Sequence, residues 1–253
     1  MSKIAFISGA SSGIGAACAE IFAKNGIDLI IAARRMGRLL ELKERCEEKY
    51  RVEILPIKLD VTDRKAVFDS FSGLPEKWSN IDILINNAGL SKGLEKIQDG
   101  KIDNWEKMID TNIKGLLYVT KAVLPEMIKR NSGTVVNIAS IAGHETYPGG
   151  NVYCATKAAV LQLSKAIRMD VLGSDVRVIS IDPGMVETEF SLVRFDNDEQ
   201  RAKQVYENIE PLRAEDIAEA VWFAVSRPKH VTIEDMVIMP TQQASTMLNI
   251  KKL

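Results

Sequence analysis

The sequence predicts an α/β fold, a doubly wound parallel sheet with helices on both faces. The first supporting observation is a regular alternation of short apolar runs with longer helical stretches along the chain. The second is that the short runs are apolar on both faces, which is typical of parallel strands covered by helices on either side. The third is a cluster of glycines between the first apolar run and the first helical stretch.

Seven apolar runs are expected to form the strands, at residues 3–8, 27–33, 52–58, 81–85, 134–139, 176–181 and 236–239. Helical periodicity predicts helices at 13–25, 35–50, 63–73, 103–129, 151–172 and 214–226. Thr62, before the third of these helices, and Asp103, at the start of the fourth, are helix-start residues. Since neither a linker nor a repeat interrupts the pattern, we expect residues 1–253 to form a single Rossmann-type domain with right-handed crossovers.

The segment 185–204 interrupts this alternation of strands and helices. It is polar and charged around two phenylalanines, Phe190 and Phe195. Long irregular segments in compact domains are often lids over a binding site. We therefore expect residues 185–204 to form a lid-like segment beside the substrate.

The charge and composition exclude several classes of protein. A formal net charge of -1 gives no electrostatic basis for binding nucleic acid or an anionic membrane. The first residues lack the features of a signal peptide, and no stretch approaches the ~20 apolar residues of a membrane span. Three widely spaced cysteines and two histidines predict neither a disulfide framework nor a metal site. We expect a cytoplasmic protein with reduced thiols.

The glycine cluster lies at a strand-to-helix turn, where a dinucleotide phosphate can bind. Gly9 permits a tight turn, Gly13 lets the backbone approach a pyrophosphate, and Gly15 lets the helix pack close to the strand. The helix N-terminus then offers free N–H groups to the phosphates. Glycines also occur in turns for purely structural reasons, so the position of the cluster is what favours a cofactor. The turn residues that we assign to cofactor binding are Gly9, Ser11, Ser12, Gly13, Ile14 and Gly15.

The second strand ends in Arg34 and Arg35, where NAD enzymes usually carry an acidic residue for the ribose 2′-hydroxyl. Two guanidinium groups at this place suit the 2′-phosphate of NADP. The alternative is a solvated basic start to the next helix. Because the helix dipole disfavours arginine at a helix N-terminus, a bound anion is the better explanation, and we predict NADP as the cofactor.

Tyr153 and Lys157 lie four residues apart on a predicted helix and so share one face. A neighbouring ammonium group favours the phenolate, so we expect Lys157 to draw the pKa of Tyr153 toward neutrality. The tyrosine could then donate or accept a proton at the operating pH. The alternative is an amphipathic helix with a buried tyrosine and a lysine that extends to solvent.

With these motifs together, the chain resembles the short-chain dehydrogenase/reductase family. The resemblance spans nearly the whole sequence and is carried in order by the glycine turn, residues 86–89, Asn112, Ser140, the Tyr153/Lys157 pair and residues 183–184. It implies a catalytic tetrad of Asn112, Ser140, Tyr153 and Lys157. Ser140 and Tyr153 would contact the substrate oxygen, Lys157 would hold the nicotinamide ribose, and Asn112 would hold a water that relays protons. A hydrogen bond at a helix kink is the alternative role for Asn112.

The resemblance also implies further contacts to the cofactor. Asp60 would meet the adenine, although an acid that caps the next helix would look the same. Thr188 would contact the carboxamide, and it could equally cap a helix. The remaining residues that the resemblance assigns to cofactor binding are Val61, Asn87, Ala88, Gly89, Pro183, Gly184 and Val186, together with Tyr153 and Lys157.

A closer resemblance is to the NADP-dependent 3-hydroxy acid dehydrogenases. The segments 80–84, 108–112, 149–153, 188–195 and 239–242 carry it. It implies small substrates such as L-serine, L-allo-threonine and 3-hydroxypropionate. It also implies a homotetramer in which the helices at 103–129 and 151–172 form a subunit interface.

A 3-hydroxy acid requires a partner for its carboxylate. Arg194, in the lid-like segment, suits this role because arginine binds planar carboxylates through two hydrogen bonds. The alternative is a surface arginine in a mobile loop. His144 and Tyr147 follow Ser140, where the family shapes its substrate pocket, and we expect them to be pocket walls.

Other functions share the same motifs. A 3-ketoacyl-carrier-protein reductase or another carbonyl reductase would use the same tetrad. A non-catalytic sensor could bind NADPH as a regulator on the same fold, although a complete tetrad argues against it. A sugar-nucleotide epimerase is disfavoured because its glycine spacing differs and it needs a larger C-terminal domain.

Overall fold

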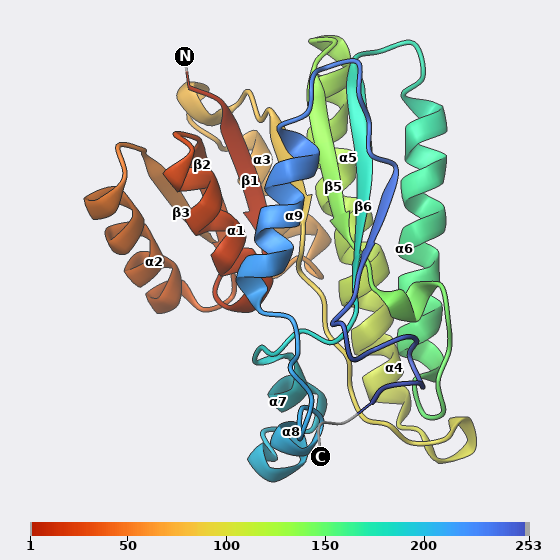
Figure 1. Cartoon of the computed structure of the whole chain (residues 1–253). Helices are drawn as coiled ribbons and strands as arrows, with labels where there is room; N and C mark the ends of the chain where they lie inside the picture. Colours follow the sequence, from red (N-terminus) through yellow and green to blue (C-terminus); the bar gives the residue numbers. More distant parts are fainter. Residues whose placement is uncertain (1, 251–253) are drawn as a thin grey trace.

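The computed structural model describes residues 2–250. Within them, a seven-stranded parallel sheet forms the middle layer, with strand order β3-β2-β1-β4-β5-β6-β7 (Figure 1). Its strands are β1 (Ile4–Ser8), β2 (Asp28–Ala33), β3 (Ile54–Lys58), β4 (Ile83–Asn86), β5 (Gly133–Ile138), β6 (Val176–Pro183) and β7 (Asp235–Ile238). The order reverses direction between β1 and β4, where ligands of doubly wound sheets bind. The predicted fold class is confirmed.

Helices cover both faces of the sheet (Figure 1). One face carries α1 (Gly13–Lys24), α2 (Met36–Lys49) and α9 (Ala214–Val225). The other carries α3 (Arg64–Ser72), α5 (Leu116–Lys129) and α6 (Asn151–Asp170). Alternate residues of each strand point to opposite faces, so Ile7 packs under α1 while Phe6 packs on the opposite side. Both faces of the sheet are therefore buried.

The single helix predicted at 103–129 is instead three consecutive pieces. These are α4 (Ile102–Ile109), a π turn (Asp110–Gly115) and α5. Within the π turn, the side chain of Asn112 is hydrogen-bonded to the backbone of Leu90 in the loop after β4, as described below. Two helix starts also differ, since Asp63 and not Thr62 caps α3 by accepting from the Ala66 amide at 2.9 Å. Asp103 lies inside the first turn of α4.

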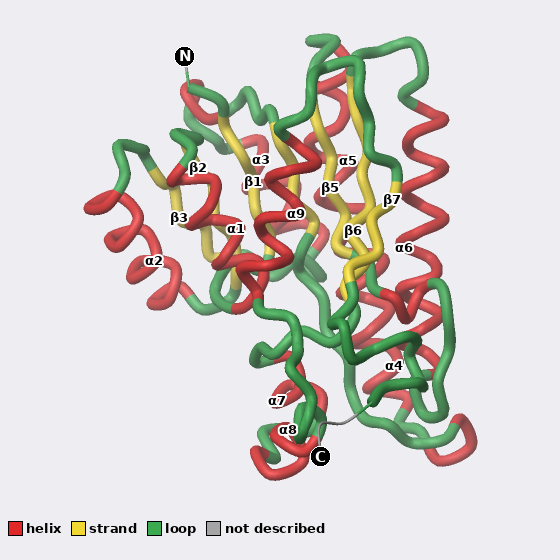
Figure 2. The backbone as a smooth tube through the Cα atoms, in the orientation of Figure 1, coloured by secondary structure: helices red, strands yellow, loops and turns green. Residues whose placement is uncertain are grey.

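The segment 185–204 is not irregular throughout. It contains two short helices, α7 (Phe190–Arg194) and α8 (Glu199–Gln204), which lie beyond one end of the sheet (Figure 2). Asp198 starts α8 by accepting from the Arg201 amide at 3.0 Å, and the buried Phe195 ring packs under the Arg201 guanidinium of α8. These contacts order a segment whose sequence alone shows no strand–helix rhythm.

The three cysteines Cys18, Cys46 and Cys154 are free and buried. Throughout residues 2–250, no helix combines the length and the apolar character needed to cross a bilayer.

Candidate active site

The loops after β1, β2, β3, β4, β5 and β6 enclose a cavity of about 360 Å³. Most of the residues assigned to the site from the sequence line it, and these are Gly9, Ser11, Ser12, Gly13, Ile14, Arg34, Arg35, Asp60, Val61, Asn87, Ala88, Gly89, Ser140, Tyr153, Lys157, Pro183, Gly184, Val186 and Thr188. The others are Gly15, Asn112, His144, Tyr147 and Arg194, and their positions are described below.

The glycine turn after β1 is shaped by close backbone packing. Gly9 has a φ of 68° and Gly13 a φ of 53°, conformations that side-chain-bearing residues rarely adopt. A Cβ atom on Gly15 would lie 2.5 Å from the Gly9 carbonyl oxygen, so only glycine lets α1 approach the turn this closely. The Asn87 side-chain amide donates to the Ser8 and Gly9 carbonyls at 3.0 and 3.2 Å, which ties the end of β4 to the same turn.

Basic and hydroxyl groups gather where β2 ends. The Arg35 guanidinium donates to the hydroxyls of Ser11 and Ser12 and also forms an ion pair with Glu189, and Arg34 lines the cavity beside it. Positive charge together with hydroxyl groups is what the 2′-phosphate of NADP requires. The residues present therefore fit this cofactor.

Asp60 and Thr188 each form hydrogen bonds within their own loops, and neither is the N-cap residue of the helix that follows. Both line the cavity. Asp60 also accepts from the Thr62 amide and hydroxyl at 3.0 and 2.8 Å, so it stabilises the turn before α3 without capping that helix. Thr188 accepts from the Phe190 amide at 3.2 Å at the start of α7. Each side chain thus shapes its own loop and faces the cavity.

Tyr153 and Ser140 meet where the first turn of α6 passes the end of β5. Ser140 donates to the Pro183 carbonyl at 3.3 Å and accepts from the Ala142 amide at 3.1 Å. Burial raises the pKa of Tyr153, and the neighbouring Tyr147 raises it further, whereas Arg194 and a hydrogen bond with Ser140 lower it. Burial is the largest of these effects.

Lys157 does not draw the pKa of Tyr153 toward neutrality as the sequence pattern suggested. Its Nζ lies 6.0 Å from the centre of the Tyr153 ring and donates to the Ile138 carbonyl at 2.8 Å. Burial lowers the pKa of Lys157 to about 8, and the negative charge of Asp182 opposes this effect. Desolvation of both groups outweighs their mutual influence.

Asn112 makes the helix-kink hydrogen bonds that were one of its two expected roles. Its Oδ1 accepts from the Leu90 amide at 2.8 Å, while its Nδ2 donates to the Leu90 carbonyl at 2.9 Å and to the Thr156 hydroxyl at 3.0 Å. The buried side chain thereby joins the π turn to the loop after β4 and to α6. Thr156 directly precedes Lys157, so this network holds the lysine in place.

Arg194 is anchored inside the protein, and the alternative of a mobile surface arginine does not describe it. Its Nη2 donates to the Tyr147 hydroxyl at 2.6 Å and its Nε donates to the Ser91 hydroxyl at 3.0 Å. The guanidinium carbon lies 5.3 Å from the ring centres of both Tyr153 and Phe190. Ser91 was not singled out from the sequence, because only its contact with Arg194 reveals it, and Phe190 was noted there only as a phenylalanine of the lid-like segment.

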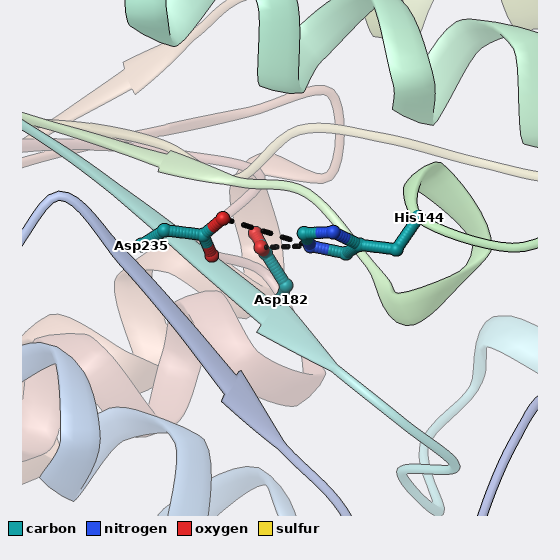
Figure 3. Close-up of side chains that lie close together, drawn as sticks. All are labelled: His144, Asp182 and Asp235. Atoms are coloured by element: carbon teal, nitrogen blue, oxygen red, sulfur yellow. Dashed lines mark hydrogen bonds and ion pairs between the residues drawn. The ribbon is translucent and has the colours of Figure 1, made fainter.

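His144 points toward Asp182 and Asp235 (Figure 3), and it is not among the residues that line the cavity. Its Nε2 lies 2.6 Å from the Asp182 Oδ2 and 3.8 Å from the Asp235 Oδ2. Burial raises the pKa of Asp182 to about 7, and a hydrogen bond with Asp235 adds to this, while hydrogen bonds from Ser180 and His144 oppose it. The imidazole is thus engaged by the buried Asp182 carboxyl group, which differs from our expectation that His144 forms a wall of the substrate pocket.

The donor atoms of His144, Asp182 and Asp235 all lie within 4.8 Å of one another, a spacing that metal sites also show. The hydrogen bond between His144 and Asp182 already accounts for the closeness of these two side chains. Asp182 acts on the site electrostatically, because its negative charge partly offsets the lowering of the Lys157 pKa by burial.

Comparison with known proteins agrees with this geometry. Residues 3–200 match the family model for short chain dehydrogenases. The chain belongs to the short-chain dehydrogenase family. It is 46% identical over 242 residues to an NADP-dependent 3-hydroxy acid dehydrogenase of Schizosaccharomyces pombe, which covers 95% of this chain and 93% of the relative. A protein with the same name from Escherichia coli K12 is 44% identical over 250 residues, 98% of this chain and 99% of the relative.

Solved structures of the family show the same fold. The closed form of serine dehydrogenase complexed with NADP+ superimposes with a TM-score of 0.92 at 44% identity, covering 99% of this chain and 100% of the other. Serine dehydrogenase from Escherichia coli has a TM-score of 0.81 at 41% identity, with 95% and 99% coverage. Together these findings confirm that this short-chain dehydrogenase is an enzyme that acts on hydroxyl groups with NADP.

Proposed function

We propose that the enzyme transfers a hydride between NADP and C3 of small 3-hydroxy acids such as L-serine, L-allo-threonine or 3-hydroxypropionate. The observation that carries this proposal is the anchored position of Arg194 beside Tyr153. A carboxylate bound to Arg194 leaves the hydroxyl on C3 within reach of the Tyr153 and Ser140 side chains. The names of the relatives from yeast and Escherichia coli support the same substrate class.

The proposed roles of the site residues follow from their chemistry. Bound NADP supplies the hydride acceptor or donor. In the oxidation direction, Tyr153 accepts the substrate hydroxyl proton, and Ser140 steadies the negative charge that develops on the oxygen. Lys157, whose Nζ lies 6.0 Å from the centre of the Tyr153 ring, holds the cofactor ribose beside the tyrosine. We propose that Asn112 positions Lys157 through its hydrogen bond to Thr156, the preceding residue on α6.

The remaining assignments from the sequence belong to the same proposal. The glycine turn and the N-terminus of α1 would hold the pyrophosphate, and Arg34, Arg35, Ser11 and Ser12 would hold the 2′-phosphate. Segment 185–204 would act as a lid over the substrate, with Tyr147 as a wall that is fixed by Arg194.

Steady-state turnover with NADP+ tests the proposal. L-serine, L-allo-threonine and 3-hydroxypropionate are compared with a simple secondary alcohol, and NAD+ serves as the cofactor control. Activity on the acids should exceed that on the alcohol by at least about tenfold, because only the acids engage Arg194. Activity on acyl thioesters or bulky ketones instead of the acids would contradict the proposed substrate class and favour a ketoacyl reductase.

We also propose a cytoplasmic homotetramer. Large apolar side chains are exposed on α5 and α6, including Leu117, Ile128 and Met169, of which Met169 is 72% exposed. Both helices lie within the ranges 103–129 and 151–172, which the resemblance assigns to a subunit interface. Light scattering behind a sizing column measures the mass directly, and a monomer would contradict the tetramer.

A further inference from the structure

Glu189, a carboxylate of the lid-like segment, lies among the basic side chains at the end of β2. Glu189 immediately precedes α7 and lines the cavity. Its Oε2 forms an ion pair with the Arg35 Nη1 at 2.8 Å, and its Oε1 accepts a hydrogen bond from Arg38. This bridge joins the lid to α2 across 154 residues of sequence.

The Arg35 guanidinium is already engaged through all three of its nitrogens. Nε donates to the Ser11 hydroxyl at 3.1 Å, and Nη2 donates to Ser11 and Ser12 at 3.0 and 2.7 Å. Nη1 contacts Glu189. The two hydroxyl groups can rotate and donate to a phosphate, whereas an ionised carboxylate can only repel one.

Glu189 is ionised near neutral pH. Partial burial acts to raise its pKa, but hydrogen bonds from Arg38 and Arg35 hold the pKa below its usual value. A dianionic phosphate at the Arg35 side chain would therefore meet a fixed negative charge unless Glu189 moved away.

We propose that Glu189 competes with the 2′-phosphate of NADP for Arg35 and Arg38, so that phosphate binding releases the start of α7 from α2. The 2′-phosphate takes over the hydrogen bonds that Glu189 gives up. NAD lacks this group, so it leaves the bridge intact and the lid attached to α2. Glu189 thereby makes the position of the lid depend on which cofactor is bound.

The strength of the bridge suits such an exchange. The side chains of Arg35, Arg38 and Glu189 are 45%, 47% and 34% exposed, so water weakens their ion pairs. A bridge of this kind can be displaced by a group with a larger negative charge. The inference concerns the cofactor alone, and it holds whichever hydroxy acid is the substrate.

Calorimetric titration with two adenosine nucleotides tests the competition. Adenosine 2′,5′-bisphosphate and AMP differ only in the 2′-phosphate, and neither carries the nicotinamide. The variant Glu189→Gln removes the negative charge from the bridge, and Glu187→Gln removes the same charge from an exposed neighbour in the same segment. All three proteins are titrated with both ligands at the same ionic strength.

Glu189→Gln should bind the bisphosphate about fivefold more tightly than the wild type, since the competing ion pairs are worth about that factor at an exposed site. Its affinity for AMP should change by less than about twofold, as should both affinities of Glu187→Gln. Unchanged or weaker binding of the bisphosphate by Glu189→Gln would overturn the proposal. An equal gain for both ligands would do so too, because it would indicate a general charge effect.

Hydrogen exchange of the Val193 amide provides an independent measure of release, because this amide donates to the Glu189 carbonyl at 3.0 Å in the first turn of α7. In the wild type, the bisphosphate should speed its exchange and AMP should not. In Glu189→Gln, exchange should be fast without ligand and should not respond to the 2′-phosphate. If both nucleotides slow the exchange equally in the wild type, Glu189 is not released and the proposal is wrong.

Discussion

The cofactor end and the substrate end of the cavity are built in different ways. Around the turn after β1, the decisive features belong to the backbone, namely the positive φ of Gly9 and the close approach that Gly15 permits. Around α6, they belong to side chains, because Tyr153 and Lys157 are buried and held by single hydrogen-bond partners. One end depends on the absence of side chains, and the other depends on particular functional groups.

This difference predicts how each end responds to mutation. A buried ammonium group such as that of Lys157 is desolvated, which destabilises the folded state. A glycine that permits close packing both stabilises the fold and shapes the cofactor site. Variants at the substrate end should therefore lose activity while keeping or gaining stability, and variants at the glycine turn should lose both.

The largest effect is expected for Tyr153→Phe. Removing the hydroxyl removes the proton acceptor, so kcat should fall by about 10³-fold, within the range of general acid–base catalysis. The dissociation constant for NADP+ should be nearly unchanged. Tyr118→Phe, on α5, controls for the loss of a tyrosine hydroxyl elsewhere. A Tyr153→Phe enzyme with more than about a tenth of the wild-type kcat would contradict the proposed role.

Lys157→Met should remove the gain in unfolding free energy that the wild type shows as the pH rises above about 8. The folded-state pKa of Lys157 is about 8, below its usual 10.5, so the unfolded chain binds more protons between these two values. The wild type should therefore gain up to about 3 kcal/mol in unfolding free energy, relative to Lys157→Met, as pH rises across this interval.

Urea unfolding of Lys157→Met and wild type at neutral pH and near the upper end of the interval measures this change. The variant should show its greatest relative stability at neutral pH, where the buried ammonium of the wild type is fully charged. A difference in stability that does not vary with pH would show that Lys157 is not desolvated.

Arg194→Leu should weaken activity on acids selectively. The loss of a charged hydrogen-bonding partner should lower kcat/KM for 3-hydroxy acids by about 30-fold, and a carboxylate-free secondary alcohol should be affected far less. Arg201→Leu is the matched control, because Arg201 lies in the same segment and packs over the Phe195 ring at 4.4 Å. Equal losses on acids and alcohols would contradict a carboxylate-binding role for Arg194.

The smallest effect is expected at the glycine turn, where Gly15→Ala tests the other half of the comparison. Its Cβ would lie 2.5 Å from both the Gly9 carbonyl oxygen and the Asn87 side-chain nitrogen, so we expect about 2 kcal/mol of destabilisation together with weaker NADP+ binding. Gly37→Ala, also in a helix but with open space around it, should gain about 0.5 kcal/mol. If the two variants unfold alike in urea, close packing at Gly15 is not what stabilises the turn.

The sequence predicted the strands well because their signal is local. Each of the seven expected runs lies within two residues of the observed strand at both ends. A parallel strand buried on both faces is apolar at every position, so no distant partner is needed to recognise it. The glycine turn and the Tyr153/Lys157 pair are equally local, since their spacing along the chain is itself the motif.

The features that the sequence could not predict depend on contacts between distant residues. In the π turn, Asn112 bonds to Leu90, which is 22 residues away in the sequence, and His144 bonds to the buried carboxyl group of Asp182, 38 residues away. The pKa of Tyr153 follows from burial and not from the spacing to Lys157. The local pattern of residues predicts none of these contacts.

The π turn at Asp110–Gly115 has a consequence for the length of the chain. The wide turn absorbs about one extra residue, so α4 and α5 keep nearly the phase of a continuous α-helix. Deleting a single residue there would restore regular helix and leave Met108, which is 2% exposed, in the core. The deletion would instead remove the wide turn from which the Asn112 side chain reaches Leu90. The number of residues in this stretch is therefore constrained by the hydrogen bonds of Asn112 and not by the packing of α4.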